Sequence, residues 1–216
     1  MEFINEMVDL FLHFDIYLGN LIEYFGSLIY VILFAFIFSE TGVVVLSFLP
    51  GDSLIFASAT FAGLGKLNIF LLWIIMLFAA ILGDTCNYTI GRYFGNKLVK
   101  SGRFIKQKHI DKTNTFFEKY GGKTIIIGRF IPVVRTLAPF VAGLGKMNYK
   151  SFLQYNVLGG FIWITLVSIV GYFFGTIDIV RENFSLMMVL IVFISISPAI
   201  FEFIRCKLAA QKLEKE

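Results

Sequence analysis

Long apolar stretches are the feature that most restricts the fold of this 216-residue chain; they cover residues 69–82, 157–175 and 184–201. A helix needs about 20 apolar residues to cross a bilayer. The last two stretches nearly meet that length alone, and the first does when it is extended to about Arg92. Composition agrees, because 57% of the residues are hydrophobic and 16% are charged, against about 25% charged in a soluble domain. The sequence predicts an all-α integral membrane protein.

Basic residues gather in two places, between Arg92 and Lys123 and after Arg205, and none precedes Lys66. Cytoplasmic loops of membrane proteins are enriched in Lys and Arg. We therefore expect the 92–123 loop and the C-terminus to be cytoplasmic. This topological role also explains the net charge of +4, so we predict no nucleic-acid partner.

The first 26 residues have apolar side chains at helical spacing, with acidic residues largely on the opposite face. This pattern predicts an amphipathic helix that lies in the membrane interface. The segment has no basic start and no small-residue cleavage site, so we expect no cleaved signal peptide.

A short string repeats in the chain: FAGLGKLN at 61–68 recurs as VAGLGKMN at 141–148. Each copy follows an apolar segment that a proline interrupts. Proline removes a backbone donor and stops a helix, so each segment is predicted to be a re-entrant hairpin of two short helices. Broken backbone of this kind is tolerated inside protein or beside a polar cavity. The residues expected to shape the hairpins are Pro50, Gly51, Gly63, Pro132, Pro139 and Gly143.

One membrane crossing separates the two hairpins, so the first is expected to open to the exterior and the second to the cytoplasm. Such an inverted repeat is the architecture of many secondary transporters. The predicted layout is one membrane domain, 1–216, with these parts: interfacial helix 1–26, hairpin 27–66, membrane helix 68–92, basic loop or helix 93–122, hairpin 123–146, membrane helices 152–175 and 184–204, and tail 205–216.

Five charged residues fall at membrane depth: Glu40, Asp52, Asp84, Arg129 and Arg135. One arginine at the bilayer centre costs about 2.5–3.5 kcal/mol. Acids opposite the arginines could offset this cost as structural ion pairs. Alternatively, the arginine forks bind a phosphate, and a desolvated carboxylate carries a proton. Asp84, in GDTCNYTIG beside Thr85, Asn87 and Tyr88, could be a structural hydrogen-bonding residue or a second ion-coupling site.

Three segments, FLPGDSLIFASATFAG, GDTCNYTIGRYFG and GRFIPVVRTLAPFVAGLGKMNYKSF, resemble the DedA family of bacterial inner-membrane proteins. The resemblance runs from about Ser39 to Trp163, and eukaryotic relatives with the same hairpin domain include lipid scramblases. It implies transport of a polyprenyl-phosphate carrier, with undecaprenyl phosphate returned to the cytoplasmic leaflet by a proton or sodium gradient. The matching positions are Glu40 and Asp52 for the acids and Arg129 and Arg135 for the phosphate. Which lipid is carried is left open.

Other function classes fit less well. The only histidines are His13 and His109, neither of which is expected at hairpin depth, and no nucleophile or metalloprotease motif occurs. These absences lead us to predict no enzyme activity and no cofactor. Cys86 and Cys206 are isolated, so we predict no metal site. A phospholipid scramblase that uses no ion gradient is the alternative. The aromatic faces of 69–82 and 184–201 leave a homo-oligomer open.

Overall fold

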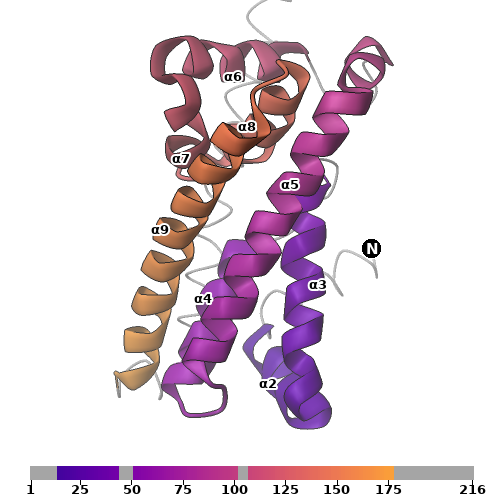
Figure 1. The fold of residues 1–216 in the computed structure, drawn as a ribbon. Coiled ribbons are helices and arrows are strands. Elements are labelled where there is room, and N and C mark those ends of the chain that lie inside the picture. Colours follow the sequence, from indigo (N-terminus) through magenta and orange to yellow (C-terminus); the bar gives the residue numbers. More distant parts are fainter. Residues whose placement is uncertain (1–13, 44–50, 102–106, 178–216) are drawn as a thin grey trace, which may run out of the picture.

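The computed structural model describes residues 14–43, 51–101 and 107–177, and all the regular secondary structure in these ranges is helical. Figure 1 shows two long helices, α5 and α9, that run side by side in opposite directions, with shorter helices packed around them. In chain order the elements are α2 (Phe14–Phe25), η1 (Gly26–Leu28), α3 (Ile29–Gly42), α4 (Gly51–Gly63), α5 (Ile69–Ser101), α6 (Gln107–Tyr120), η3 (Gly121–Lys123), α7 (Thr124–Gly128), α8 (Pro132–Leu144) and α9 (Tyr149–Thr176).

Within the described ranges, three helical stretches are long and apolar enough to cross a membrane: Tyr17–Gly42, Ile69–Gly95 and Tyr149–Thr176. The last two correspond to the predicted membrane helices 68–92 and 152–175. The third predicted helix, 184–204, lies outside the described residues, as do Pro50 and the basic tail. The all-α membrane architecture predicted from the sequence is confirmed.

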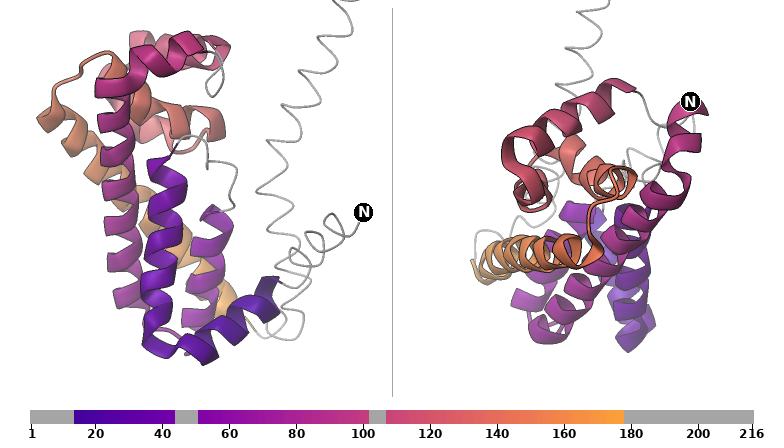
Figure 2. Two further views of the ribbon diagram at one scale, coloured as in Figure 1. Left: turned by 90° about the vertical axis from the view of Figure 1, so that its right-hand side faces the viewer. Right: turned by 45° about the horizontal axis from the view of Figure 1, so that its top comes forward.

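The stretch Tyr17–Gly42 overlaps the predicted interfacial helix and the first arm of the first hairpin. Gly26 separates its two halves with φ of 52°, a left-handed conformation that glycine adopts without a steric penalty. The chain bends there, and α2 lies at an angle to α3 (Figure 2).

In each candidate hairpin, one helix ends and another begins between the two arms. α3 ends at Gly42, α4 begins at Gly51, and the two helices run in opposite directions (Figures 1 and 2). In the second half, Ile131 is extended at φ −123° and ψ 109°, as expected before a proline, and Pro132 starts α8. Pro139 lies inside α8 and does not end it. That the arms enter and leave a bilayer on one side stays a prediction.

Each second arm packs mainly against the long helix of the other half: α4 against α9, and α8 against α5. Glycines allow these helices to approach closely. A Cβ atom on Gly63 would overlap the main-chain carbonyl of Tyr172, and one on Gly143 would overlap that of Tyr88. Small residues of this kind are typical of packed membrane helices.

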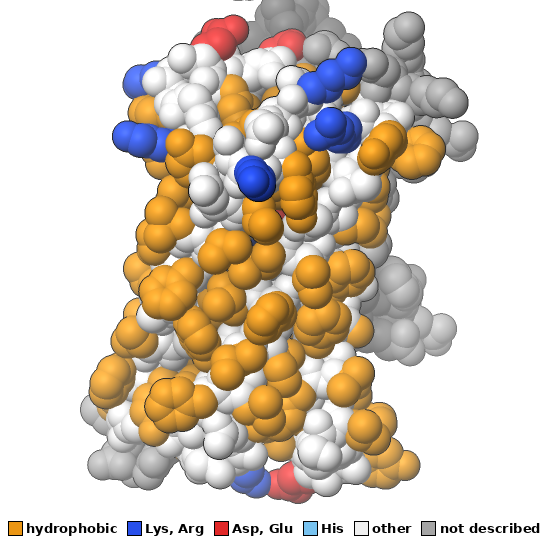
Figure 3. Space-filling view, in the orientation of Figure 1, with side chains coloured by type: hydrophobic (Ala, Val, Ile, Leu, Met, Phe, Trp, Pro, Cys, Tyr) orange, Lys and Arg blue, Asp and Glu red, His pale blue; other side chains and the backbone are white. Residues whose placement is uncertain are grey.

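The surface in Figure 3 has a broad hydrophobic belt, with lysine and arginine above it and a charged patch below it. Several large apolar side chains of α5 and α9 are more than half exposed, among them Phe70, Phe78 and Phe173. An apolar surface of this extent is what a bilayer would cover. Lys66, in the turn between α4 and α5, pairs with Glu23 of α2 at 2.5 Å.

Candidate functional site

Among the described residues, two ion pairs lie inside the bundle, and they use four of the five predicted charged residues. Arg129, in the link between α7 and α8, pairs with Asp84 of α5. Arg135, in the first turns of α8, pairs with Asp52 at the start of α4. The two pairs differ in their exposure and in the helices that they join.

The Arg129–Asp84 pair is fully enclosed, with side-chain exposures of 3% and 4%. Arg129 Nη2 also donates to Asn156 Oδ1 at 2.6 Å, and Asn156 Nδ2 donates to the Ile81 carbonyl at 3.1 Å. A Cβ on Gly159 would lie 3.2 Å from the Arg129 side chain, so α9 leaves just enough space for it. The network ties α5, α9 and the α7–α8 link together.

Arg129 keeps unused hydrogen-bonding capacity. Its Nε and Nη1 atoms are buried and have no hydrogen-bond partner among the described residues. A buried donor without a partner is costly. This part of the guanidinium is therefore able to bind a further acceptor.

The Arg135–Asp52 pair is more open, because the Asp52 side chain is 36% exposed whereas that of Arg135 is 9% exposed. Trp163 of α9 covers it: the indole Nε1 donates to Asp52 Oδ1 at 2.9 Å, and Arg135 Cζ lies 5.6 Å from the ring centroid. Phe130 packs edge-on against Trp163 at 5.1 Å and is itself 48% exposed. An aromatic wall therefore borders an accessible ion pair.

Glu40 lies beside this pair at the end of α3. Its side chain is buried, and its carboxylate occupies the space over Gly51, where a Cβ would overlap it. The Oε2 atom has no hydrogen-bond partner in the described part of the chain. Glu40 thus places a second carboxylate next to Asp52 without an arginine of its own.

The first turns of α4 and α8 meet at the Asp52–Arg135 contact. Helix N-termini favour negative charge through their free N–H groups and the helix dipole. Asp52 occupies such a position in α4. The start of α4 therefore places a carboxylate against the Arg135 guanidinium.

Several polar residues at the site were not singled out as site residues from the sequence. Trp163 and Asn156 both lie on the apolar helix α9, and a polar side chain in such a helix is a signal that could have found Asn156. Asn87 Nδ2 donates to the Thr136 carbonyl at 2.9 Å and so ties α5 to α8.

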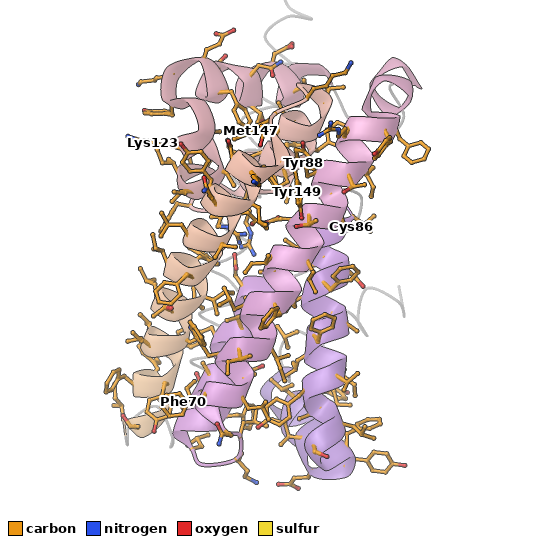
Figure 4. The ribbon with its side chains drawn as sticks, viewed as in Figure 1. Phe70, Cys86, Tyr88, Lys123, Met147 and Tyr149 are labelled. Atoms are coloured by element: carbon orange, nitrogen blue, oxygen red, sulfur yellow. The ribbon has the colours of Figure 1, made fainter. Side chains whose placement is uncertain are left out.

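A second polar cluster lies at the α6 end of the bundle, where Figure 4 labels Tyr88, Met147 and Tyr149. The Tyr88 hydroxyl donates to the Met147 carbonyl and accepts from Arg92 Nη1 at 2.8 Å. Cys86 is a free, half-buried thiol. Among the described residues, no group of three or more histidines, cysteines or acids is arranged to hold a metal ion.

All the site residues except Glu40 lie within a recognised domain. The model of the VTT domain matches residues 49–173. Protein DedA of Escherichia coli (strain K12) is 48% identical over 219 residues, which cover 100% of both chains. An uncharacterized membrane protein of Mycobacterium leprae (strain TN) is 40% identical, covering 76% of this chain and 74% of its own.

Inner membrane protein YghB of Escherichia coli (strain K12) is 30% identical over 79% of each chain. No solved structure matches the chain. The family model covers more than half of the chain, and the strongest of these similarities extends over its full length. The chain belongs to the DedA family of membrane proteins and carries its VTT domain.

Proposed function

We propose that this protein moves a polyprenyl-phosphate lipid, undecaprenyl phosphate or a similar carrier, from the outer to the cytoplasmic leaflet of the inner membrane, coupled to a proton or sodium gradient. The observation that carries the proposal is the Arg135–Asp52 pair, a guanidinium inside the bundle whose counter-ion is 36% exposed. An arginine fork matches the oxygens of a phosphate. The N-terminus of α4, where Asp52 lies, adds to the preference for an anion.

Exchange of partners offers a mechanism. A lipid phosphate that binds Arg135 competes with Asp52 for the same N–H groups. The released carboxylate then lies beside Glu40, and two neighbouring carboxylates inside a membrane protein are costly to keep ionised. Uptake of a proton, or of a sodium ion between Asp52 and Glu40, removes that cost and couples the cation to the lipid.

Arg129 has a different role from Arg135 in this proposal. Because Asp84 and Asn156 both hold its Nη2, we propose that Arg129 mainly fastens α5 to α9. Its buried Nε and Nη1 remain available to a phosphate oxygen. Asp84 is then a structural partner rather than an ion-coupling group.

The lipid chain needs an apolar path. A pocket of about 380 Å³ lies between α5 and α9, with Phe70, Trp73, Phe161 and Phe173 among its lining residues. Its walls are apolar apart from hydroxyl groups, so they suit an isoprenoid chain and exclude a charged head group. Figure 4 places Phe70 at the end of the bundle opposite Tyr88.

The rival function is an ion-independent scramblase, which the accessible Asp52 also suits, because a polar groove open to the membrane lets head groups pass passively. The two functions differ in coupling. We would measure leaflet transfer of fluorescent undecaprenyl phosphate in liposomes with and without an imposed pH or sodium gradient. Transfer that follows the gradient in the wild type and fails in Arg135→Ala supports the transporter.

Equal transfer of many phospholipids without a gradient supports the scramblase instead. No transfer of any lipid, by protein that is folded in the same liposomes, would contradict both functions. It would leave the two ion pairs as structural contacts.

A further inference from the structure

The repeat in the sequence extends into the long helices. GRYFG at 91–95 in α5 matches GYFFG at 171–175 in α9, again eighty positions apart. α5 begins at Ile69 and α9 at Tyr149, with the same offset. Residue n of the first half therefore matches residue n + 80 of the second. The first hydrogen bonds of these helices match too: Leu72 N to Asn68 O at 3.0 Å, and Phe152 N to Asn148 O at 2.9 Å.

The main-chain or side-chain atoms that lie nearest to matched glycines belong to residues that do not match. Gly171 of α9 lies against the Phe56 carbonyl of α4, whereas the matching Gly91 of α5 lies against the Phe140 carbonyl of α8. Phe140 matches Thr60, not Phe56. The contact in the α8–α5 pair is therefore four residues later along the arm.

The next glycine along each long helix has the same displacement. Gly175 lies against the Thr60 carbonyl, whereas the matching Gly95 lies against the Leu144 side chain. Leu144 matches Leu64, which is again four residues beyond Thr60.

The glycine near the end of each arm gives a third comparison. A Cβ on Gly63 would lie nearest to the Tyr172 carbonyl, whereas one on Gly143 would lie nearest to the Tyr88 carbonyl, with the main-chain nitrogen of Arg92, which matches Tyr172, further away at 2.8 Å. Tyr88 matches Ser168, which lies four residues before Tyr172 on the long helix. A contact four residues earlier on the long helix is the same displacement as a contact four residues later on the arm. Four residues amount to about one helical turn, roughly 5.4 Å.

The ends of the arms are also unequal. The residue with positive φ after α4 is Gly65, at 79°, whereas after α8 it is Lys146, at 54°. Gly145, which matches Gly65, stays at φ −74°. The second arm thus continues one residue further and puts a lysine where a glycine is favoured.

We infer that the two registers are two states available to each arm, and that α4 and α8 slide together by one turn along α5 and α9. Each arm runs parallel to its long helix, because later residues of one contact later residues of the other. The long helices themselves run in opposite directions (Figure 1). Exchanging the registers moves α8 towards its C-terminus and α4 towards its N-terminus, which is the same direction in space. Sliding one half of the sequence past the other would not exchange both registers.

The two ion pairs belong to different parts of the molecule in this movement: one to the sliding arms α4 and α8, the other to the long helices α5 and α9, which form a fixed frame. Asp52–Arg135 joins α4 to α8 and therefore holds the moving arms together. Asp84, Arg129 and Asn156 join α5 to α9 and hold the frame. A displacement of one turn past a fixed neighbour is a known form of protein transition.

Of the side-chain hydrogen bonds seen in the described residues, two join the arms α4 and α8 to the long helices α5 and α9 and must be broken in the slide: Trp163 Nε1 to Asp52 Oδ1, and Asn87 Nδ2 to the Thr136 carbonyl. Movement by one turn would carry the Asp52–Arg135 site towards the α6 end of the bundle. Only the purpose of this slide rests on the proposed transport. The slide itself is measured without any lipid substrate, so its failure and that of the transport proposal are distinguishable.

Disulfide formation in membranes can report each register in the full chain with Cys86→Ser and Cys206→Ser. A Cβ on Gly95 would lie 3.4 Å from the Leu144 Cβ, which is within reach of a disulfide. The pair Gly95→Cys with Leu144→Cys should therefore form in the register seen here. The matched pair, Gly175→Cys with Leu64→Cys, should form only when α4 has slid by one turn.

Glycine replacements at the arm ends should shift the balance in opposite directions. Lys146→Gly relieves the left-handed lysine of the present register, so it should favour the 95–144 disulfide by on the order of tenfold. Lys66→Gly should favour the other register and lower the rate of the 95–144 disulfide. Because Lys66 also pairs with Glu23, Glu23→Gln is its control.

The proposal is overturned if the 64–175 disulfide never forms and neither glycine replacement alters the rate at the 95–144 pair. If Gly175→Cys prevents folding, the rate of the 95–144 disulfide still tests the slide, because it should rise in Lys146→Gly and fall in Lys66→Gly. Neither replacement changes a residue at the helix contacts. Equal responses to the two replacements would contradict the slide.

Discussion

The indole of Trp163 donates to the carboxylate of Asp52 at 2.9 Å while its ring lies against Arg135, so one side chain contacts both members of the accessible ion pair. This contact holds the Asp52 carboxylate in the position where it pairs with the Arg135 guanidinium. A lipid phosphate must displace the carboxylate, and the indole hydrogen bond opposes that displacement.

Trp163→Phe should therefore strengthen binding of the lipid phosphate. The change keeps an aromatic ring beside Arg135 and removes a hydrogen bond to a charged group, which is worth about 1.5–3 kcal/mol. We expect affinity to rise by about tenfold, measured by titration of undecaprenyl phosphate in detergent.

Trp73→Phe is the matched control, because its indole donates at 3.0 Å to Thr165 and not to a charged residue. Because Trp73 also lines the pocket proposed for the isoprenoid chain, that change should alter the affinities for undecaprenyl phosphate and undecaprenol alike, whereas Trp163→Phe should alter only the affinity for the phosphate. If both replacements alter the two affinities alike, Trp163 has no special relation to the site.

Replacement of the two arginines should lower the stability of the protein by different amounts. Arg129→Met leaves Asp84 buried without its partner, which should cost about 3–5 kcal/mol of unfolding free energy. Arg135→Met leaves a carboxylate that is 36% exposed, so its cost should be smaller. Thermal unfolding in one detergent checks the order, and a larger loss for Arg135→Met would contradict the assignment of Arg129 to the frame.

The close helix contacts make a third prediction. Gly143→Ala and Gly63→Ala each place a methyl group on a main-chain carbonyl, and overpacking of this kind costs about 1–3 kcal/mol. Both should lower the unfolding temperature. Gly19→Ala is the control, because its Cβ would meet only the Phe61 ring at 3.5 Å, and a comparable loss there would show that helix glycines are sensitive regardless of contact.

Glu40→Gln should separate coupling from movement of the lipid. The change keeps the shape of the side chain and removes the second carboxylate beside Asp52. In liposomes, transfer should continue while its dependence on the gradient falls several-fold. Dependence on the gradient that matches the wild type would remove Glu40 from the coupling step.

The membrane helices α5 and α9 were predictable because an apolar run of sufficient length has few alternatives in a bilayer. The break before Pro132 follows from proline chemistry in the same way. Local physics determines these features, so a single sequence is enough to find them.

The pairing of the charges was not predictable. Two arginines and three acids allow several combinations, and only the packing of α4 and α5 selects Asp52–Arg135 and Asp84–Arg129. Trp163 and Asn156 gain their roles from α9 lying beside both pairs. The one-turn difference in register is also absent from the sequence, because the matched strings are nearly the same in both halves.

The central claim is that Arg135 binds the phosphate of the lipid. The most direct measurement compares binding of undecaprenyl phosphate with that of undecaprenol, which has the same chain without the phosphate, in wild type, Arg135→Lys and Arg92→Lys. Arg92 lies on α5 and bonds to Tyr88, so it controls for loss of any arginine. The account predicts a preference for the phosphate of at least about tenfold in wild type and Arg92→Lys, because two charge-assisted bonds to a fork are lost without it, and little preference in Arg135→Lys. An unchanged preference in Arg135→Lys would contradict it.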